Sequence, residues 1–168
     1  MKTNAKTRVL YLTQAGLIAA IYVVVTYLLS AFSFGEVQVR VSEMLTVLPY
    51  FTLAAIPGVS IGCLIANLVS GAAIPDIIFG SLATLVGAIF TYKLRKRNIV
   101  LAVLPTIIAN TIVVPWVLKY AYGTPLPIPF MMLTVGIGEV ISCGVLGVLF
   151  GKVIGRYKRV VFGELANK

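Results

Sequence analysis

The amino-acid sequence predicts an all-α integral membrane protein with six transmembrane helices and with both termini in the cytoplasm. Of its 168 residues, 60% are hydrophobic and 11% are charged, whereas about 25% of the residues in a soluble domain are charged. The apolar residues form long runs, and most basic residues gather in three segments that flank those runs. The length predicts one six-helix domain over residues 1–168, without an added soluble domain.

The first apolar run extends from about Val9 to Phe32 and follows a basic start. A signal peptide also begins with basic residues, but its apolar core has about 7–15 residues. The run exceeds that length and provides the roughly 20 residues that a spanning helix needs. We therefore interpret it as a retained first span.

The next segment, residues 34–51, has the sequence FGEVQVRVSEMLTVLPYF. In its first half Glu36, Gln38, Arg40 and Ser42 alternate with valines. This period of two is typical of an extended segment with one polar face. Charged residues at a membrane boundary belong either to a solvated loop or to a binding site, and both interpretations apply to this segment.

Five further helices are predicted from the remaining apolar runs, at about 43–55, 57–73, 76–92, 99–118 and 130–154. The first of these is short, because about 13 residues that rise 1.5 Å each span about 20 Å, less than the roughly 30 Å of the hydrocarbon core. We therefore expect its outer end to lie below the membrane surface and to leave room for a cavity.

Loop charge predicts the orientation of the bundle. With the N-terminus in the cytoplasm, every base except Arg40 and Lys119 lies on the inner side, as the positive-inside rule requires. The net charge of +9 is thus explained by topology, so we expect contact with the lipid membrane and no nucleic-acid partner. Four of the five acids lie on the outer side or inside the membrane. This distribution predicts an outward-facing pocket for a cationic or amine-bearing solute.

Glu139 lies about ten residues into the last predicted helix, which places it about 15 Å deep, near the bilayer centre. A lone carboxylate there costs at least about 2.5–3.5 kcal/mol, so Glu139 must be protonated, paired or exposed to a polar cavity. A ligand site, a structural hydrogen bond and a proton relay all satisfy this requirement. Asn67 and Asn110 reach a similar depth. Asparagine often joins helices in membranes, but three polar groups at one depth predict a shared pocket.

Glu43 and Asp76 stand at the starts of predicted helices, where carboxylates can cap free N–H groups. For Asp76 we favour this capping role, whereas Glu43 adjoins the polar face of the preceding segment. Arg40 is placed to pair with Glu36 or Glu43 and so to hold the segment closed over the cavity. All four residues are candidates for a binding site.

Three aromatic residues are candidates for stacking on a flat ligand: Tyr50, Phe79 and Trp116. Aromatic rings near membrane boundaries also pack against lipid or the protein core. For each of the three, packing is the more common role.

Small residues form two pairs with a spacing of four in the first predicted helix. Ala15 pairs with Ala19, and Gly16 pairs with Ala20. Small residues at this spacing let helices approach closely, either inside the bundle or against a partner protein.

The sequence contains no histidine, and it has neither a nucleotide-binding loop nor a serine triad. Cys63 and Cys143 lie inside apolar runs, with a spacing unlike that of a disulfide framework or a metal site. We therefore expect no metal or other cofactor in this chain and no enzymatic activity. If ATP drives transport, separate subunits must hydrolyse it.

Four strings of the sequence resemble one protein family: GEVQVRVSEMLTVLPYF, IPGVSIGCLIANL, PDIIFGSLATLVGA and the GEV of the last predicted helix. They are similar to the QueT family, the queuosine-precursor group among the substrate-binding S components of energy-coupling factor (ECF) transporters. The resemblance covers nearly the whole chain. Its specific parts are the first string and the run Gly80–Ala88.

The resemblance implies a subunit of the prokaryotic cell membrane that binds a 7-deazaguanine, such as preQ1, preQ0 or queuine, from outside. It implies that the Ala15/Ala19 face docks on a membrane coupling protein, which works with two ATPase subunits. It also implies that the loop at residues 33–42 covers the pocket as an extracellular lid. The alternatives are an S component for another nucleobase or vitamin, and a self-contained small-solute transporter.

Overall fold

The computed structural model describes residues 5–29 and 39–165 of the chain. Within these residues all regular elements are helices, which confirms the all-α prediction. The elements follow one another in this order: α1 (Ala5–Leu28), η1 (Val41–Tyr50), α3 (Ala55–Val69), η2 (Asp76–Gly80), α4 (Ser81–Lys93), α5 (Ile99–Ala121), α6 (Ile128–Glu139), η3 (Val140–Gly147), α7 (Val148–Phe162) and η4 (Gly163–Leu165).

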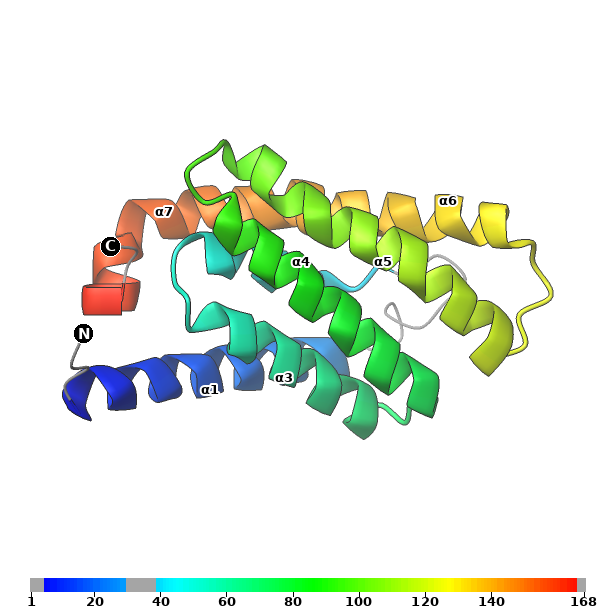
Figure 1. Ribbon diagram of the computed structural model, residues 1–168, viewed down its shortest axis with the longest axis horizontal. Coiled ribbons are helices and arrows are strands. Elements are labelled where there is room, and N and C mark those ends of the chain that lie inside the picture. Colours follow the sequence, from blue (N-terminus) through cyan, green and yellow to red (C-terminus); the bar gives the residue numbers. More distant parts are fainter. Residues whose placement is uncertain (1–4, 30–38, 166–168) are drawn as a thin grey trace.

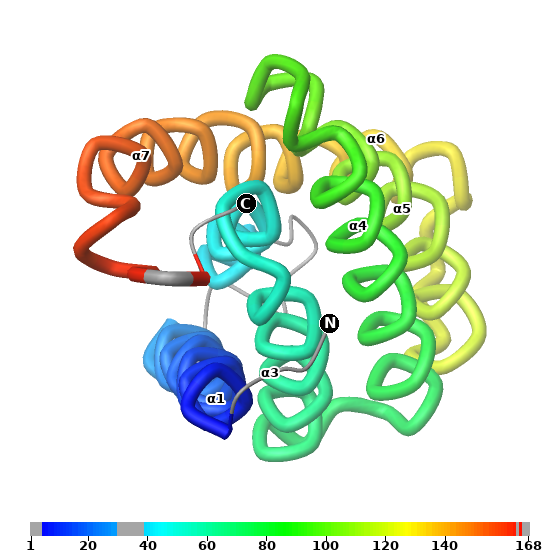
Figure 2. Tube along the Cα trace, turned by 60° about the vertical axis from the view of Figure 1, so that its left-hand side comes forward, coloured from blue at the N-terminus to red at the C-terminus, as the bar shows by residue number. Residues whose placement is uncertain are grey.

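Helix η1 lies at the centre of the bundle. Figure 2 shows it surrounded by longer helices, and it contacts α1, α3, α4, α5, η3 and α7. It is a 3-10 helix whose side chains are mostly buried, among them Glu43, Thr46 and Val47. A 3-10 helix rises about 2.0 Å per residue, so the 10 residues of η1 span about 20 Å. The central element is therefore as short as the sequence predicts.

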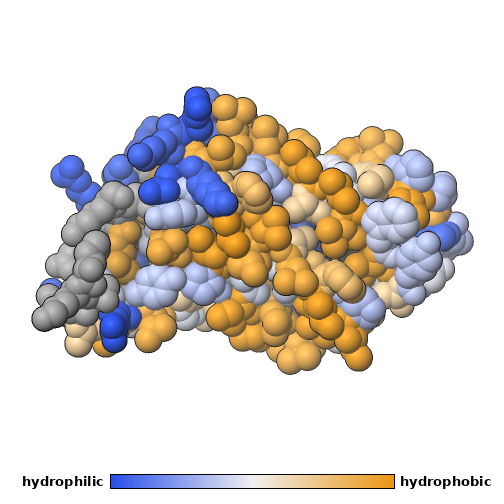
Figure 3. Space-filling view, in the orientation of Figure 1, coloured by the Kyte–Doolittle hydropathy of each residue, from blue (hydrophilic) through white to orange (hydrophobic). Residues whose placement is uncertain are grey.

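The exterior of the bundle is apolar. Within residues 5–29 and 39–165, four helices are long and apolar enough to cross a membrane, and the helix Ala55–Val69 is apolar but shorter. Many leucine, isoleucine and valine side chains of these helices are exposed. Figure 3 shows them as a hydrophobic band, with hydrophilic residues at the ends. These features support a multi-pass membrane protein, and the number of six spans stays a prediction.

Several helices differ from the predicted boundaries. The first begins at Ala5 rather than Val9, because lysine and arginine side chains can extend toward the interface while their backbone stays helical. The second is a 3-10 helix over 41–50 rather than an α-helix over 43–55; it contains Pro49, which lacks the N–H that an α-helix uses. The last helix continues from α6 through η3 and α7 to Phe162, because its basic residues occupy exposed positions.

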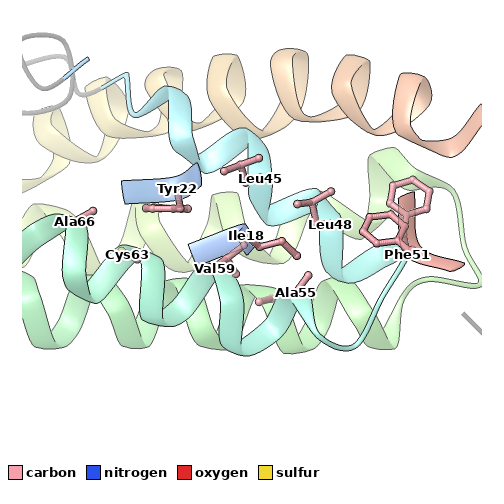
Figure 4. Close-up of a cluster of buried hydrophobic side chains, with 11 residues drawn as sticks. Ile18, Tyr22, Leu45, Leu48, Phe51, Ala55, Val59, Cys63 and Ala66 are labelled. Carbon is pink, nitrogen blue, oxygen red and sulfur yellow. The ribbon is translucent and has the colours of Figure 1, made fainter. Parts of the chain in front are cut away.

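A hydrophobic cluster joins α1, η1 and α3 (Figure 4). It contains these side chains: Ile18 and Tyr22 from α1, Leu45 and Leu48 from η1, and Val59 and Cys63 from α3. At one end of η1 the ring of Phe51 stacks on Phe162, with ring centroids 6.1 Å apart. This contact holds the end of α7 against the end of η1.

Small residues bring α1 and α3 close together. A Cβ atom added to Gly62 would lie 3.1 Å from the Cα atom of Ala19. Ala15 and Ala19 are accordingly buried against the bundle, so α3 blocks the face that the resemblance implies for docking. Gly16 and Ala20 lie on the exposed side of α1 and form the small-residue face that a partner can reach.

The contact between α4 and α5 depends on Gly87, where an added Cβ would lie 2.7 Å from the Cα atom of Thr106. Because this neighbour is backbone, we expect Gly87→Ala to destabilise the fold by about 1–3 kcal/mol, measured as a lower unfolding midpoint in detergent. Gly16→Ala is the matched control, since nothing lies within 4 Å of its added Cβ. It should be neutral or slightly stabilising. Equal effects of the two substitutions would contradict this packing.

Candidate functional site

Buried polar side chains gather around the first residues of η1. Each of them is at least nine-tenths buried. We call this group the polar cluster, and its members are Tyr22 of α1, Arg40 before η1, Glu43 of η1, Cys63 and Asn67 of α3, Asp76 of η2, Thr84 of α4, Asn110 of α5, Glu139 of α6 and Cys143 of η3. The structure thus brings together six residues that the sequence analysis selected.

Glu43 is the central acid of the polar cluster. Its Oε1 atom accepts hydrogen bonds from the Tyr22 hydroxyl at 2.5 Å and from the Thr84 hydroxyl at 3.4 Å. Its Oε2 atom is buried and has no hydrogen-bond partner among the described residues. An unpaired buried carboxylate oxygen is costly, so Glu43 has one oxygen left for a ligand or a proton.

Glu139 lies close to Glu43, with carboxylate oxygens of the two acids within 4.8 Å of each other. Its Oε1 atom accepts a hydrogen bond of 3.0 Å from the Asn110 amide, so the predicted proximity of these two residues is correct. The Cys143 thiol lies 3.3 Å from Oε2 of Glu139 and 3.4 Å from the main-chain oxygen of Glu43, and it can donate to either. Cys143 therefore connects the two acids.

Arg40 and Asp76 form a buried ion pair next to these acids. The Nη2 atom of Arg40 lies 3.2 Å from Oδ2 of Asp76 and 3.4 Å from Oδ1. Among the described residues, the Asp76 carboxylate accepts hydrogen bonds from the side chains of Arg40 and Tyr122. Asp76 lies in the first turn of η2, and its capping role stays a prediction. The ion pair that the described residues show for Arg40 joins it to Asp76 rather than to Glu43. Glu36, the other predicted partner, lies outside the described residues.

The ion pair is held by α3 and by the end of α5. The Asn67 amide donates to the main-chain oxygen of Asp76 at 3.3 Å. The Tyr122 hydroxyl donates to Oδ2 of Asp76 and accepts from the main-chain N–H of Ala73, both at 3.0 Å. Burial raises the pKa of the Tyr122 phenol, which keeps it a donor. Gly80 leaves space for the Asp76 carboxylate, because a Cβ atom at residue 80 would lie 2.9 Å from its Oδ1 atom.

The charges of the polar cluster do not balance. Arg40 and Asp76 compensate each other, which leaves Glu43 and Glu139. Carboxylate oxygens of these two acids and the Cys143 sulfur lie within 4.8 Å of one another. Two unit charges at that distance repel by about 3 kcal/mol at an effective dielectric constant of about 20. The arrangement therefore suits a cation or a ligand rich in N–H donors.

The same three side chains include the donor types of a metal site, but their hydrogen bonds indicate another use. A metal binds the thiolate form of cysteine. The Cys143 sulfur instead lies at donor distance from two oxygen acceptors, Oε2 of Glu139 and the main-chain oxygen of Glu43, the environment of a protonated thiol. We therefore do not interpret these residues as metal ligands.

Two π-helical stretches position the acids. Asp76 begins η2, and Glu139 directly precedes η3, which contains Cys143. A π-helical turn inserts an extra residue and redirects the side chains around it, and such turns occur frequently at functional sites. Both irregular stretches contact η1 or the elements next to it.

Three of the predicted binding residues that the structure describes do not belong to the polar cluster. Tyr50 is at the other end of η1, where its hydroxyl donates to the main-chain oxygen of Arg97. Phe79 and Trp116 are about half exposed and line an apolar groove on the outside of η2 and α5. Glu36 and most of the predicted lid at 33–42 lie outside the described residues.

The sequence analysis did not select Tyr22, Cys63, Thr84 or Cys143 of the polar cluster, nor Tyr122 beside it, for the site. Cys143 had a readable signal, because it lies four residues after Glu139 and so on the same helix face. A tyrosine inside an apolar span also signals a hydrogen-bond partner, since buried tyrosine hydroxyls are normally paired. Thr84 and Tyr122 depend on the tertiary packing of α4 and α5, for which the sequence holds no local signal.

Comparisons with known proteins identify relatives of the chain. The model of a protein family described as QueT transporter matches residues 12–156. A protein of Lactococcus lactis subsp. cremoris (strain MG1363), described as "Queuosine precursor transporter QueT", is 41% identical over 83 residues, which are 48% of this chain and 48% of the relative. The chain thus spans about half the length of the curated relative that it matches. No solved structure matches the chain.

The Arg40–Asp76 ion pair predicts strong coupling between two substitutions. Arg40→Gln or Asp76→Asn alone leaves a buried charge without its partner, and we expect each to destabilise the fold by about 3–5 kcal/mol. The double variant removes both charges of the pair, so neither is left without its partner, and its loss should be smaller than the sum of the two. Unfolding midpoints in detergent for the four proteins give the coupling as a double-mutant cycle. Strictly additive losses would show that the pair does not form.

Proposed function

The chain belongs to the QueT transporter family, and from this premise we propose that it is the substrate-binding membrane subunit of an ECF-type transporter for a queuosine precursor. The observation that carries the proposal is the pair of buried acids, Glu43 and Glu139, in a helical membrane protein. A buried carboxylate pair without its own cation is expensive to maintain. A ligand that supplies several hydrogen-bond donors or a positive charge offsets the cost of this carboxylate pair.

The chemistry of a 7-deazaguanine, such as preQ1, preQ0 or queuine, suits the polar cluster. One edge of the base carries an N–H and an exocyclic amine, which a carboxylate can accept as a pair. The carbonyl of the base needs a donor, such as the amide of Asn67 or Asn110. An ammonium group on the side chain of the ligand favours a second carboxylate. Tyr22 is the aromatic residue of the cluster and replaces the outward-facing Phe79 and Trp116 as a candidate for ring contact.

The proposed topology has six spans, a cytoplasmic N-terminus and C-terminus, and a location in the cell membrane. The start of α1, the α4–α5 connection and the end of α7 lie at one end of the molecule (Figure 1), as an even number of spans requires. The basic residues of these segments support their cytoplasmic location. The polar cluster begins at Arg40, which lies within the segment proposed as the extracellular lid at 33–42.

The proposed partners are a membrane coupling protein and two ATPase subunits. The sequence lacks a nucleotide-binding loop, so ATP hydrolysis requires other chains. The exposed Gly16 and Ala20 face of α1 allows a close helix contact with the coupling protein. A self-contained transporter is the competing function.

We expect the purified chain in detergent to bind 7-aminomethyl-7-deazaguanine, and Glu139→Gln to weaken this binding by at least about tenfold, because a hydrogen bond to a charged group contributes about 1.5–3 kcal/mol. Isothermal titration calorimetry, with guanine and queuine as comparison ligands, measures the affinities. Glu164→Gln makes the same chemical change in η4, outside the polar cluster, and should leave the affinity unchanged. Equal affinities of the two variants would place the binding site elsewhere.

Liposomes distinguish the ECF subunit from a self-contained transporter. With the coupling protein and both ATPases present, uptake of the radiolabelled precursor should require ATP. Liposomes that contain the chain alone should bind the precursor without accumulating it. Sustained flux through the chain alone would support the competing function.

A further inference from the structure

We propose that Glu43 and Glu139 form a proton-exchange site, which releases one proton for each positive charge that the ligand brings into it. The inference rests on the proposed function, because it concerns the same site. It determines which precursors the site binds well and how their binding depends on pH.

One base faces three acids in the polar cluster. Residues 9–92 contain a single lysine or arginine, Arg40. It pairs with Asp76, so no described base compensates Glu43 and Glu139. Lys119 lies in the last turn of α5. Its Nζ atom donates to the main-chain oxygens of Thr124 and Leu126. The two acids must therefore find their compensation in protons or in a ligand.

Among the described residues, the surroundings of the acid pair provide hydrogen bonds but no positive charge besides that of Arg40. The elements packed against the two acids place these titratable or charged groups next to them: Tyr22 from α1, Arg40 before η1, Cys63 from α3, Asp76 from η2 and Cys143 from η3. Helices α4 and α5 contribute the neutral side chains of Thr84 and Asn110. Since two like charges in a buried site do not both ionise, the empty pair holds at least one proton.

The buried Oε2 atom of Glu43 also points to a ligand. It has no hydrogen-bond partner among the described residues, although Glu43 is 1% exposed. The other carboxylate oxygens of the pair each accept from a described donor. Oε2 of Glu43 is therefore available to accept a hydrogen bond. In the empty site the donor can be a carboxyl O–H of the pair, and in the occupied site it can be an N–H of the ligand.

The exchange keeps the buried charge constant. When an ammonium group enters, a carboxyl O–H of the pair gives its proton to water, and the carboxylate that forms accepts an N–H of the ammonium. One positive charge enters and one leaves, so the membrane interior gains no net charge. A neutral ligand brings no charge, and the proton stays. By linkage, affinity for an ammonium-bearing ligand rises about tenfold per pH unit while the pair still holds the exchangeable proton, and affinity for a neutral ligand stays flat.

Two ligands of the same base test the exchange on the unaltered full-length chain. Isothermal titration calorimetry in buffers of different ionisation enthalpy counts the protons released on binding. We expect 7-aminomethyl-7-deazaguanine, whose amine stays charged near neutral pH, to release one proton more than the neutral 7-cyano-7-deazaguanine. Between about pH 6 and 8, affinity for the aminomethyl ligand should rise up to about tenfold per unit, with little change for the cyano ligand.

Variants and a metal analysis complete the test. The double variant Glu43→Gln/Glu139→Gln removes both carboxyl groups that can exchange a proton, so proton release and the pH slope of any remaining binding should both fall toward zero. Glu164→Gln should behave like the unaltered chain. Equal proton release for both ligands would overturn the exchange and leave the proposed function intact. Binding of neither ligand would overturn the proposed substrate and the exchange with it. A stoichiometric metal ion in the purified chain that the ligand displaces would overturn the exchange, because the ion and not a proton would then compensate the two acids.

Discussion

The hydrogen bond between Tyr22 and Glu43 is the interaction on which the centre of the molecule depends. Helix η1 is too short to reach across a membrane, yet it contacts most of the helices around it. Its first turn therefore ends inside the bundle, where water cannot satisfy a carboxylate. Donors from α1 and α4 satisfy one oxygen of Glu43 instead. The same donors fix the position of η1 relative to both helices.

The polar cluster has two parts with different electrostatic character. Arg40 and Asp76 form a compensated pair that is held by Asn67 and Tyr122. A buried pair of this kind contributes little net stability compared with apolar packing, but it fixes which segments lie together: the residues before η1, the start of η2 and the end of α5. Glu43 and Glu139 are uncompensated, and a site of that kind is retained where it binds something.

The sequence predicted the fold class and the centre of the site because both follow from the cost of polar groups in lipid. Composition and loop charge predict a helical membrane protein, and depth along a helix selects Glu139 and Asn110, which the structure joins by a hydrogen bond. The Arg40–Asp76 pair was not predicted, because its two residues are 36 positions apart and meet only through the packing of η1 on α3 and η2. Likewise, helix spacing alone could not assign Ala15 and Ala19 to the interior rather than to a partner.

The irregular helices explain the remaining errors. The sequence predicts a regular α-helix over 43–55, and it offers Tyr50 as an aromatic candidate for stacking on a flat ligand. The 3-10 geometry of η1 stretches the same residues along the axis, so Glu43 stays in the polar cluster while Tyr50 reaches the α4–α5 connection. The π-helical stretches η2 and η3 also change the directions of side chains. Each inserts a residue next to an acid that faces inward, Asp76 in η2 and Glu139 before η3. The local sequences of these stretches carry no proline or other signal for such a turn. The geometry of the site is thus set by departures from regular helices, whereas its chemistry is readable from the residues themselves.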